Sequence, residues 1–247
     1  MKSEILSDKE LRKFSQQIQL HDVGPGGQEL IKKARVLVIG AGGKGSTALQ
    51  DLVTSGVGRI GICDNYLVED PALPRQSLYG DSDLGRQKAI IASQRLSELT
   101  RLTNFELHNI CLSESNIQTI ISSYDIVLDA TDNFAAHYLI NDACLNAGKP
   151  VVFGSVYHNT IIISVFNYKN GPSLRSLYPD VPHNQDGSSD EGIASEFFPY
   201  SMAGNFMAHE TLKIILRLEG TLSGKVLRFC ISDYSCTIDS LSDASDH

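Results

Sequence analysis

The sequence predicts an α/β protein with a mostly parallel sheet, helices on both faces, and antiparallel strands added in its C-terminal half. Three observations predict this fold class. A short apolar run leads into a glycine-rich turn and a helical pattern within residues 35–55. Strand and helix patterns then alternate as far as residue 154, which is typical of a parallel sheet. After that residue the alternation stops, which favours antiparallel strands.

The clearest motif lies between Arg35 and Asp64. Arg35–Ile39 is apolar and rich in branched residues, as in a buried parallel strand. Glycines follow at the G-x-G-x-x-G spacing, then a helical pattern over Lys44–Ser55 and a second strand, Arg59–Cys63. Glycines let the backbone approach phosphates, the helix start offers free N–H groups, and the acidic residue accepts from a ribose hydroxyl. The motif predicts a Rossmann-like nucleotide site; the alternative is a turn whose glycines serve only packing. The predicted site residues are Gly40, Gly42, Gly43, Gly45 and Asp64.

Capping signals and apolar spacing predict the elements around this motif. Ser7 with Glu10 three residues later predicts a helix over 7–20. Glycines at 24–27 end it, and 28–33 forms a short helix before the first strand. Two prolines mark 65–83 as a loop. The helical pattern over 84–99 carries Lys88 near its start.

Alternating patterns continue through the middle of the chain. We expect a strand over 104–110 and a helix over 113–122, with Ser113 as its cap. An apolar run over 125–129 predicts a strand, and a helix over 134–147 is closed by Gly148. The strand 151–154 follows. This repetition indicates a parallel sheet with right-handed crossovers.

The last third of the chain lacks the βαβ rhythm. Strand patterns at 160–168, 225–232 and 235–240 suit antiparallel additions to one sheet edge. Between them we expect a mobile excursion over 170–196, which is rich in Pro, Gly, Ser and Asp, and a long helix over 199–218. We expect disorder at 242–247. The whole chain, 1–247, is predicted to be one domain, with helices at 7–33, a nucleotide-binding half at 34–154 and the additions at 155–241.

Composition limits the class of protein. The 247 residues are 42% hydrophobic, which suits one domain with a sizeable core. A net charge of −8 disfavours non-specific nucleic-acid binding. No apolar run reaches membrane length and the first eight residues are too polar for a secretory signal, so we expect a cytoplasmic protein. The five cysteines form no C-x-x-C pair, so the sequence does not predict structural zinc.

Polar residues follow three of the predicted strands, at 40–45, 64–76 and 129–133. Open parallel sheets bind ligands at this carboxyl edge. Arg75 and Lys88 are cations that would compensate a triphosphate, and Asp132 offers the hard oxygen that Mg²⁺ prefers. These parts predict nucleotidyl transfer, in which a carboxylate attacks the α-phosphate and pyrophosphate leaves.

Alternatives remain for each part of this prediction. Arg75 could form a surface salt bridge, Lys88 could be a solvated helix residue, and Asp132 could cap the helix that follows it. The glycines and Asp64 alone would also permit a nicotinamide-dependent oxidoreductase. No Ser/Tyr/Lys or His/Asp catalytic arrangement stands out in the sequence, and the cations serve a triphosphate better.

Several short motifs occur together over about residues 10–240: Gln17-Ile18, Gly26–Gln28, Arg35–Gly45, Gly56–Gly58, Asp64, Arg75-Gln76, Gly85–Lys88 and Asp129–Asn133. In this combination the sequence resembles the ThiF/MoeB/HesA adenylyltransferases, bacterial relatives of ubiquitin-activating enzymes. The resemblance implies a homodimer that uses ATP and Mg²⁺. It implies that the C-terminal Gly-Gly carboxylate of a small ubiquitin-like sulfur carrier, or of a peptide, becomes an acyl-adenylate.

The resemblance also implies roles for individual residues. Asp64 would hold the ribose, Arg75 and Lys88 the phosphates, and Asp132 the magnesium ion. Arg75, Lys88 and Asp132 are therefore the catalytic candidates, and Gln76 and Asn133 are further nucleotide-binding candidates.

Some positions depart from the family pattern. Ser173 and Ser176 stand where the family has zinc-binding cysteines, so we do not expect structural zinc. Gln16 stands where an arginine reaches across the family's dimer, and Ala72 and Tyr66 replace an asparagine and an acidic residue. The cysteine that some members carry before the late helix is missing near Glu191. These departures leave open a catalytically impaired partner subunit.

Overall fold

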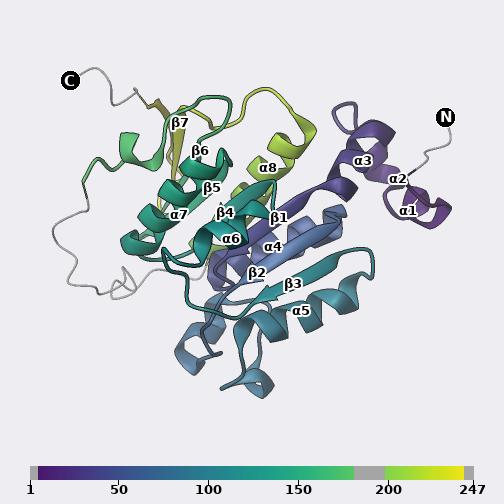
Figure 1. The fold of residues 1–247 in the computed structure, drawn as a ribbon, viewed down its shortest axis with the longest axis horizontal. Helices are drawn as coiled ribbons and strands as arrows, with labels where there is room; N and C mark the ends of the chain where they lie inside the picture. The colour runs from purple at the N-terminus through teal and green to yellow at the C-terminus, as the bar shows by residue number, and fades with distance from the viewer. Residues whose placement is uncertain (1–4, 181–197, 242–247) are drawn as a thin grey trace.

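The computed structural model describes residues 5–180 and 198–241, and these form one eight-stranded sheet (Figure 1). Its strand order is β3-β2-β1-β4-β5-β6-β7-β8. The first five strands of this order are parallel, and β6, β7 and β8 are added antiparallel at one edge. The predicted fold class is confirmed. The strands are β1 (Arg35–Ile39), β2 (Arg59–Cys63), β3 (Asn104–His108), β4 (Ile126–Asp129), β5 (Val151–Tyr157), β6 (Thr160–Phe166), β7 (Lys225–Cys230) and β8 (Cys236–Ser240).

Helices cover both faces of the sheet. One apolar core joins the sheet to α3, α4, α5 and α8, and a second core joins its other face to α6 and α7. The helices are α1 (Asp8–Lys13), α2 (Ser15–Ile18), α3 (Gly24–Lys33), α4 (Gly43–Ser55), α5 (Lys88–Leu99), α6 (Ile117–Ser122), α7 (Phe134–Ala147) and α8 (Phe198–Leu216). Short 3₁₀ helices lie at η1 (Asp70–Arg75), η2 (Asp81–Asp83) and η3 (Leu174–Ser176).

The strand order reverses next to β1. The chain moves from β1 outward through β2 to β3, and then returns to place β4 on the other side of β1. Such a switch point leaves the helices that follow the two central strands on opposite faces of the sheet, so their N-termini diverge. The carboxyl ends of β1, β2 and β4 are therefore the edge at which a ligand is expected.

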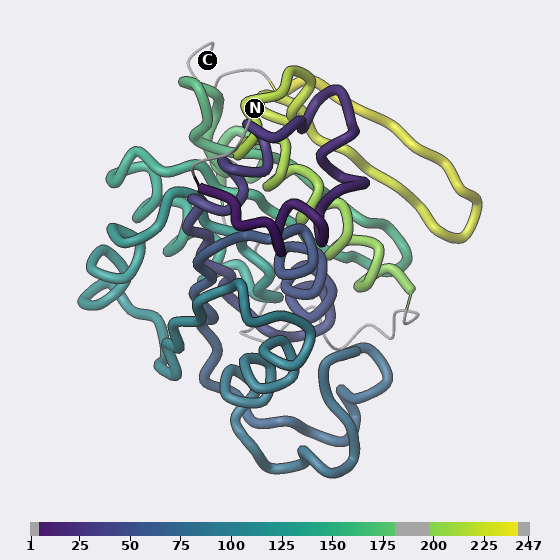
Figure 2. The backbone as a smooth tube through the Cα atoms, turned by 90° about the vertical axis from the view of Figure 1, so that its right-hand side faces the viewer, coloured from purple at the N-terminus to yellow at the C-terminus, as the bar shows by residue number. Residues whose placement is uncertain are grey.

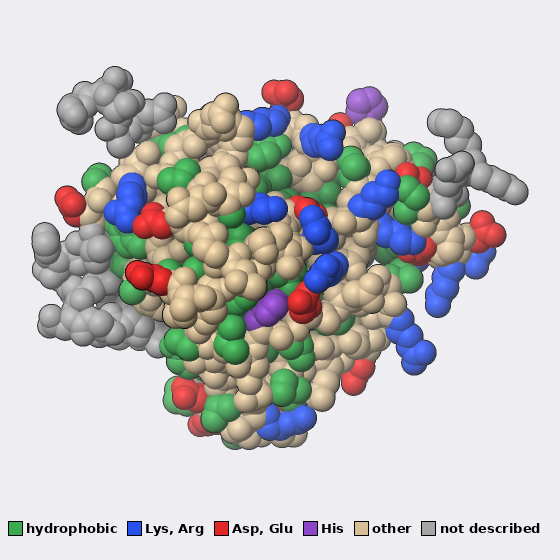
Figure 3. Space-filling model, in the orientation of Figure 1, with side chains coloured by type: hydrophobic (Ala, Val, Ile, Leu, Met, Phe, Trp, Pro, Cys, Tyr) green, Lys and Arg blue, Asp and Glu red, His purple; other side chains and the backbone are tan. Residues whose placement is uncertain are grey.

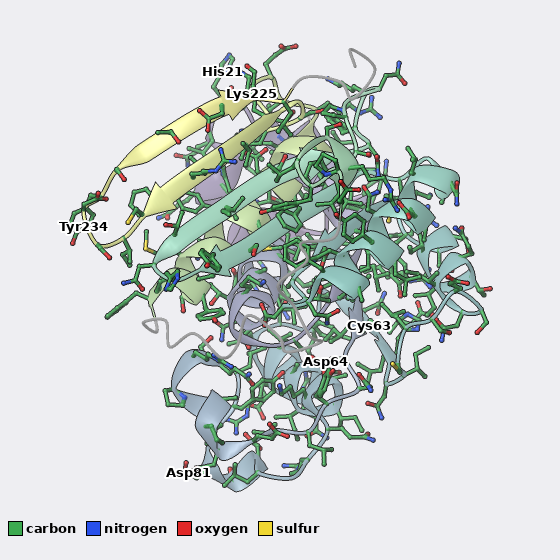
Figure 4. All side chains as sticks on the ribbon, turned by 90° about the vertical axis from the view of Figure 1, so that its left-hand side faces the viewer. His21, Cys63, Asp64, Asp81, Lys225 and Tyr234 are labelled. Atoms are coloured by element: carbon green, nitrogen blue, oxygen red, sulfur yellow. The ribbon has the colours of Figure 1, made fainter. Side chains whose placement is uncertain are left out.

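Two segments extend from the body of the molecule (Figure 2). The β7–β8 hairpin runs along one side, with Tyr234 at its turn (Figure 4). The segment between β2 and α5 lies at the opposite end of the molecule and contains η1 and η2. This second segment carries Arg75 and Gln76, so its position decides whether they reach the glycine turn.

The N-terminal helices differ from the prediction. The helix expected over 7–20 begins with the predicted Ser7–Glu10 capping box but breaks at Phe14, where φ is −98° and ψ is 15°. Phe14 is buried, and its ring packs against Gly56. Residues 24–27 were predicted to separate two helices, but in the structure they form the first turn of α3. Pro25 is tolerated there because the N–H that it lacks has no partner in the first turn of a helix.

Two later helices begin after their predicted starts. The helix expected from residue 84 starts at Lys88, since Gly85 has a φ of +75° that a helix excludes. The helix expected from Ser113 starts at Ile117, and its N-cap is Asn116. Ser113 instead lies in a turn in which the Asn116 side chain accepts its backbone N–H.

The remaining differences concern lengths. β5 extends to Tyr157 because β6 pairs with it along its whole length. Of the excursion expected at 170–196, residues 170–180 contain η3; the rest, and the tail at 242–247, lie outside the described residues.

Within residues 5–180 and 198–241, no helix combines the length and the apolarity needed to cross a membrane. Acidic and basic side chains are interspersed on the face in Figure 3.

Candidate nucleotide-binding site

The glycine turn lies where β1, β2 and β4 end. Gly40 has a φ of +91°, a backbone conformation that favours glycine, and its N–H donates to the Cys63 carbonyl at 2.8 Å. A Cβ on Gly45 would overlap the Gly40 carbonyl oxygen, so the first turn of α4 lies directly against the end of β1. The first N–H groups of α4 have no partner within the helix and are available to an anion.

Asp64 is fixed beside this turn. Its carboxylate accepts the Ala41 N–H at 2.7 Å and the Tyr66 N–H at 2.8 Å. Burial raises the pKa of Asp64, the carboxylate of Asp132 adds to the rise, and the charge of Lys88 opposes it. Figure 4 shows Asp64 between the sheet and the segment that carries Asp81. Asp64 is thus a hydrogen-bond acceptor at the position that the motif predicts.

Lys44 and Asp132 form an ion pair across the switch point. The Lys44 ammonium donates to Asp132 Oδ1 at 2.6 Å and to the Thr131 carbonyl at 2.7 Å. The Lys44 side chain is 1% exposed, whereas that of Asp132 is 32% exposed. The sequence did not single out Lys44, because the glycine motif admits any residue there. The available signal was a lysine in the first turn of a helix, where a positive charge is unfavourable without an anionic partner.

Arg75 and Gln76 lie against the same turn. A Cβ on Gly43 would be 2.8 Å from the Arg75 carbonyl oxygen and 2.9 Å from Tyr200 Cβ. The Arg75 guanidinium lies over the Tyr200 ring, 5.2 Å from its centre. Gln76 is buried, and its Oε1 has no partner in the described part of the chain. An unpaired buried amide oxygen is unusual and is suited to accepting a hydrogen bond from a ligand.

Lys88 also faces this edge of the sheet. It is the first residue of α5, and its ammonium lies 5.7 Å from the centre of the Tyr66 ring. Its charge opposes the rise in the pKa of Asp64 that burial causes. The Tyr79 hydroxyl donates to the Ala41 carbonyl at 2.8 Å, which ties the segment before Lys88 to the glycine turn. The structure therefore gathers the predicted acid, both predicted cations and the glycines at one edge.

Comparison with known proteins adds an independent finding to this geometry. The sequence profile of the ThiF family matches residues 14–243. The chain belongs to the ThiF family.

Its relatives in this family include two curated adenylyltransferases. The sulfur carrier protein adenylyltransferase of Thermus thermophilus is 39% identical over 227 residues, which are 90% of this chain and 83% of that protein. The adenylyltransferase and sulfurtransferase MOCS3 of Culex quinquefasciatus is 40% identical over 226 residues, which are 91% of this chain and 51% of that protein. The ThiF-family chain thus spans most of the first relative and about half the length of the second.

The crystal structure of E. coli MccB with ATP shares the fold. It superposes with a TM-score of 0.82 over 95% of this chain and 73% of that chain, at 19% sequence identity.

A buried network supports the turn after β4 in this ThiF-family chain. Asp129 Oδ1 accepts hydrogen bonds from the Thr131 N–H at 3.0 Å and from the Thr131 hydroxyl at 2.7 Å. Asp129 Oδ2 lies 2.7 Å from His137 Nδ1. Burial alone would raise the pKa of Asp129, but these partners outweigh it and hold the pKa below its usual range. The network fixes the backbone that presents Asp132.

Asn133 has a structural role in the described chain. Its side-chain oxygen accepts the Ala136 N–H at 2.8 Å, which makes Asn133, not Asp132, the N-cap of α7. This leaves the Asp132 carboxylate free for Lys44 and for a ligand. Nucleotide binding by Asn133 stays a prediction.

Proposed function

We propose that this ThiF-family protein transfers the AMP group of ATP to the C-terminal carboxylate of a small ubiquitin-like sulfur-carrier protein and releases pyrophosphate. The names of the Thermus and Culex relatives support adenylyl transfer, and the first supports a sulfur carrier as the acceptor. The observation that carries the proposal is the gathering of Arg75, Lys88, Asp64 and Asp132 around one glycine turn.

The chain's own residues suggest how this reaction proceeds. Asp64 would accept a hydrogen bond from the ribose, and the first N–H groups of α4 would hold phosphate oxygens. A carboxylate oxygen of the acceptor attacks the α-phosphorus, and the bond to the oxygen that bridges to the β-phosphate breaks. Arg75 and Lys88 would neutralise the charge that develops on the departing pyrophosphate. No covalent bond to the protein is required.

Asp132 is the residue that would hold Mg²⁺. The Lys44 ammonium donates a hydrogen bond to Asp132 Oδ1, while Asp132 Oδ2 has no hydrogen-bond partner among the described residues. The same residues contain no group of three or more His, Cys, Asp or Glu side chains that could hold a metal. One carboxylate oxygen suffices for Mg²⁺, which keeps several waters and takes further oxygens from substrate phosphates. When bound, the ion would neutralise phosphate charge.

We further propose that the protein is a cytoplasmic homodimer. All five cysteines are free thiols, which supports a reducing compartment. The dimer follows from the resemblance to the family, in which the position of Gln16 faces the partner; Gln16 is exposed in the single chain. Equilibrium sedimentation is expected to give twice the chain mass of 27.0 kDa. A mass of one chain at micromolar concentration would contradict the dimer.

Pyrophosphate exchange tests the proposed reaction. With a ubiquitin-like sulfur carrier ending in Gly-Gly, we expect label from pyrophosphate to enter ATP. The matched control is the same carrier with its terminal carboxylate amidated, which removes the nucleophile and should stop the exchange. Calorimetric titration should detect ATP and not NAD. Binding of NAD without binding of ATP, or a lack of exchange with any Gly-Gly carrier, would contradict the proposal. Measurable exchange would contradict the alternative that the chain is a catalytically impaired partner subunit.

Replacing Arg75 with alanine is expected to weaken ATP binding by about tenfold or more, because a charge-assisted hydrogen bond to a phosphate is lost. The melting temperature should change little, since Arg75 is a half-buried cation whose guanidinium lies over the Tyr200 ring. Arg101→Ala is the control: Arg101 is exposed and lies before β3, at the opposite edge of the sheet. Equal affinities for the two variants would remove Arg75 from the site.

A further inference from the structure

Lys44 is a buried charge in an unfavourable place. Its side chain is 1% exposed, and it lies in the first turn of α4, where the helix dipole repels a cation. Removing an ammonium group from water is costly unless it is paired and hydrogen-bonded. The partners that offset this cost are the Asp132 carboxylate and the Thr131 carbonyl. Both follow β4, so the ion pair joins the two sides of the switch point.

The pair also changes what Asp132 can bind. One carboxylate oxygen is engaged at 2.6 Å by Lys44, and the other remains open on a side chain that is 32% exposed. Because the carboxylate charge is already compensated, a bare divalent cation gains little there. A divalent cation that arrives together with phosphate oxygens still finds one free carboxylate oxygen.

Lys44 sets the sign of the charge around the turn. Lys44 pairs with Asp132, Lys88 acts on Asp64, and the Arg75 guanidinium lies over the ring of Tyr200, whose Cβ is beside Gly43. Without Lys44 the formal charges of the other four charged side chains would cancel. A lysine ammonium has three N–H donors, and its bonds to Thr131 and Asp132 use two of them. The third has no hydrogen-bond partner among the described residues.

We propose that Lys44 is a positioning residue that acts as an internal counter-ion for Asp132. It holds the carboxylate in place, prevents the empty site from taking up free divalent cations, and lets the triphosphate bind before the metal. This inference rests on the proposed nucleotide site. It predicts that the wild-type protein binds ATP measurably in the presence of EDTA and does not bind Mn²⁺ alone.

Lys44→Met tests the inference by calorimetry, because methionine keeps the length and removes the charge. In EDTA we expect the affinity for ATP to fall by about tenfold or more. With no nucleotide present, we expect the variant to gain binding of Mn²⁺, since Asp132 is released. The control is Lys213→Met, which breaks a comparable lysine–carboxylate pair with Glu210 on α8, at 2.6 Å, and should leave both titrations unchanged.

Asp132→Asn gives the opposite change in the same measurement and does not depend on Lys44→Met folding. It removes the negative charge and leaves the ammonium, so ATP in EDTA should bind as tightly as in the wild type or more tightly. If Lys44→Met binds ATP in EDTA like the wild type, or Asp132→Asn binds it tenfold more weakly, the Lys44 inference is wrong while the nucleotide site stands. If the wild type binds no ATP even with Mg²⁺, both are wrong.

Discussion

Replacing Asp132 with asparagine is expected to lower the rate of pyrophosphate exchange by about a hundredfold or more, because the carboxylate that would hold Mg²⁺ is lost, and one group that stabilises charge in the transition state contributes about 3–4 kcal/mol. The side-chain oxygen of asparagine can still accept from the Lys44 ammonium, so the fold should persist. The measurement is the exchange rate at saturating ATP and carrier, together with the melting temperature of each protein. Full exchange by Asp132→Asn would remove Asp132 from the mechanism.

Asp132→Ala is the less informative variant. It would leave the buried Lys44 ammonium with the Thr131 carbonyl as its remaining hydrogen-bond partner among the described residues. Breaking a buried ion pair by removing one partner costs about 3–5 kcal/mol, and the lower end applies here because Asp132 is 32% exposed. Loss of exchange in Asp132→Ala would therefore mix lost chemistry with lost stability. A larger fall in melting temperature for Asp132→Ala than for Asp132→Asn would support this loss of stability.

Much of the site was predictable because parallel strands end at one edge. The strand that ends at Ile39, the glycine spacing and Asp64 are local features, and the alternation of strands and helices brings residues 129–133 beside them. Arg75 and Lys88 were predicted from their chemistry and the family pattern. Their approach to the turn depends on the packing of the segment between β2 and α5, which local sequence does not specify.

What the sequence could not predict depends on contacts between distant residues. The Lys44–Asp132 pair joins positions 88 residues apart, and the glycine motif specifies no residue type at position 44. The break at Phe14 arises because its ring packs against Gly56, which lies in another helix cap. The late starts of α5 and α6 reflect a positive φ at Gly85 and a turn in which the Asn116 side chain accepts the Ser113 N–H, so that Ser113 does not cap the helix.

Gly45→Ala is expected to destabilise the fold and abolish ATP binding together. A Cβ at this position would overlap the Gly40 carbonyl oxygen, so either α4 must move away from β1 or the Gly40 peptide must rotate. Rotation would break the Gly40 N–H bond to the Cys63 carbonyl, which joins the ends of β1 and β2. Overpacking at such a site costs about 1–3 kcal/mol or more. For a chain of this size that corresponds to a fall in melting temperature of roughly 2–12 °C.

The loss of ATP binding should exceed what instability alone causes. The turn that must move carries the Ala41 N–H that holds Asp64, so the ribose acceptor and the helix N–H groups shift together. Gly26→Ala is the matched control, because a Cβ there meets nothing within 4 Å and the residue lies inside α3. It should leave ATP affinity unchanged and raise stability by about 0.4–1 kcal/mol. Normal ATP affinity in Gly45→Ala at a temperature where the variant is folded would show that phosphates do not sit on this turn.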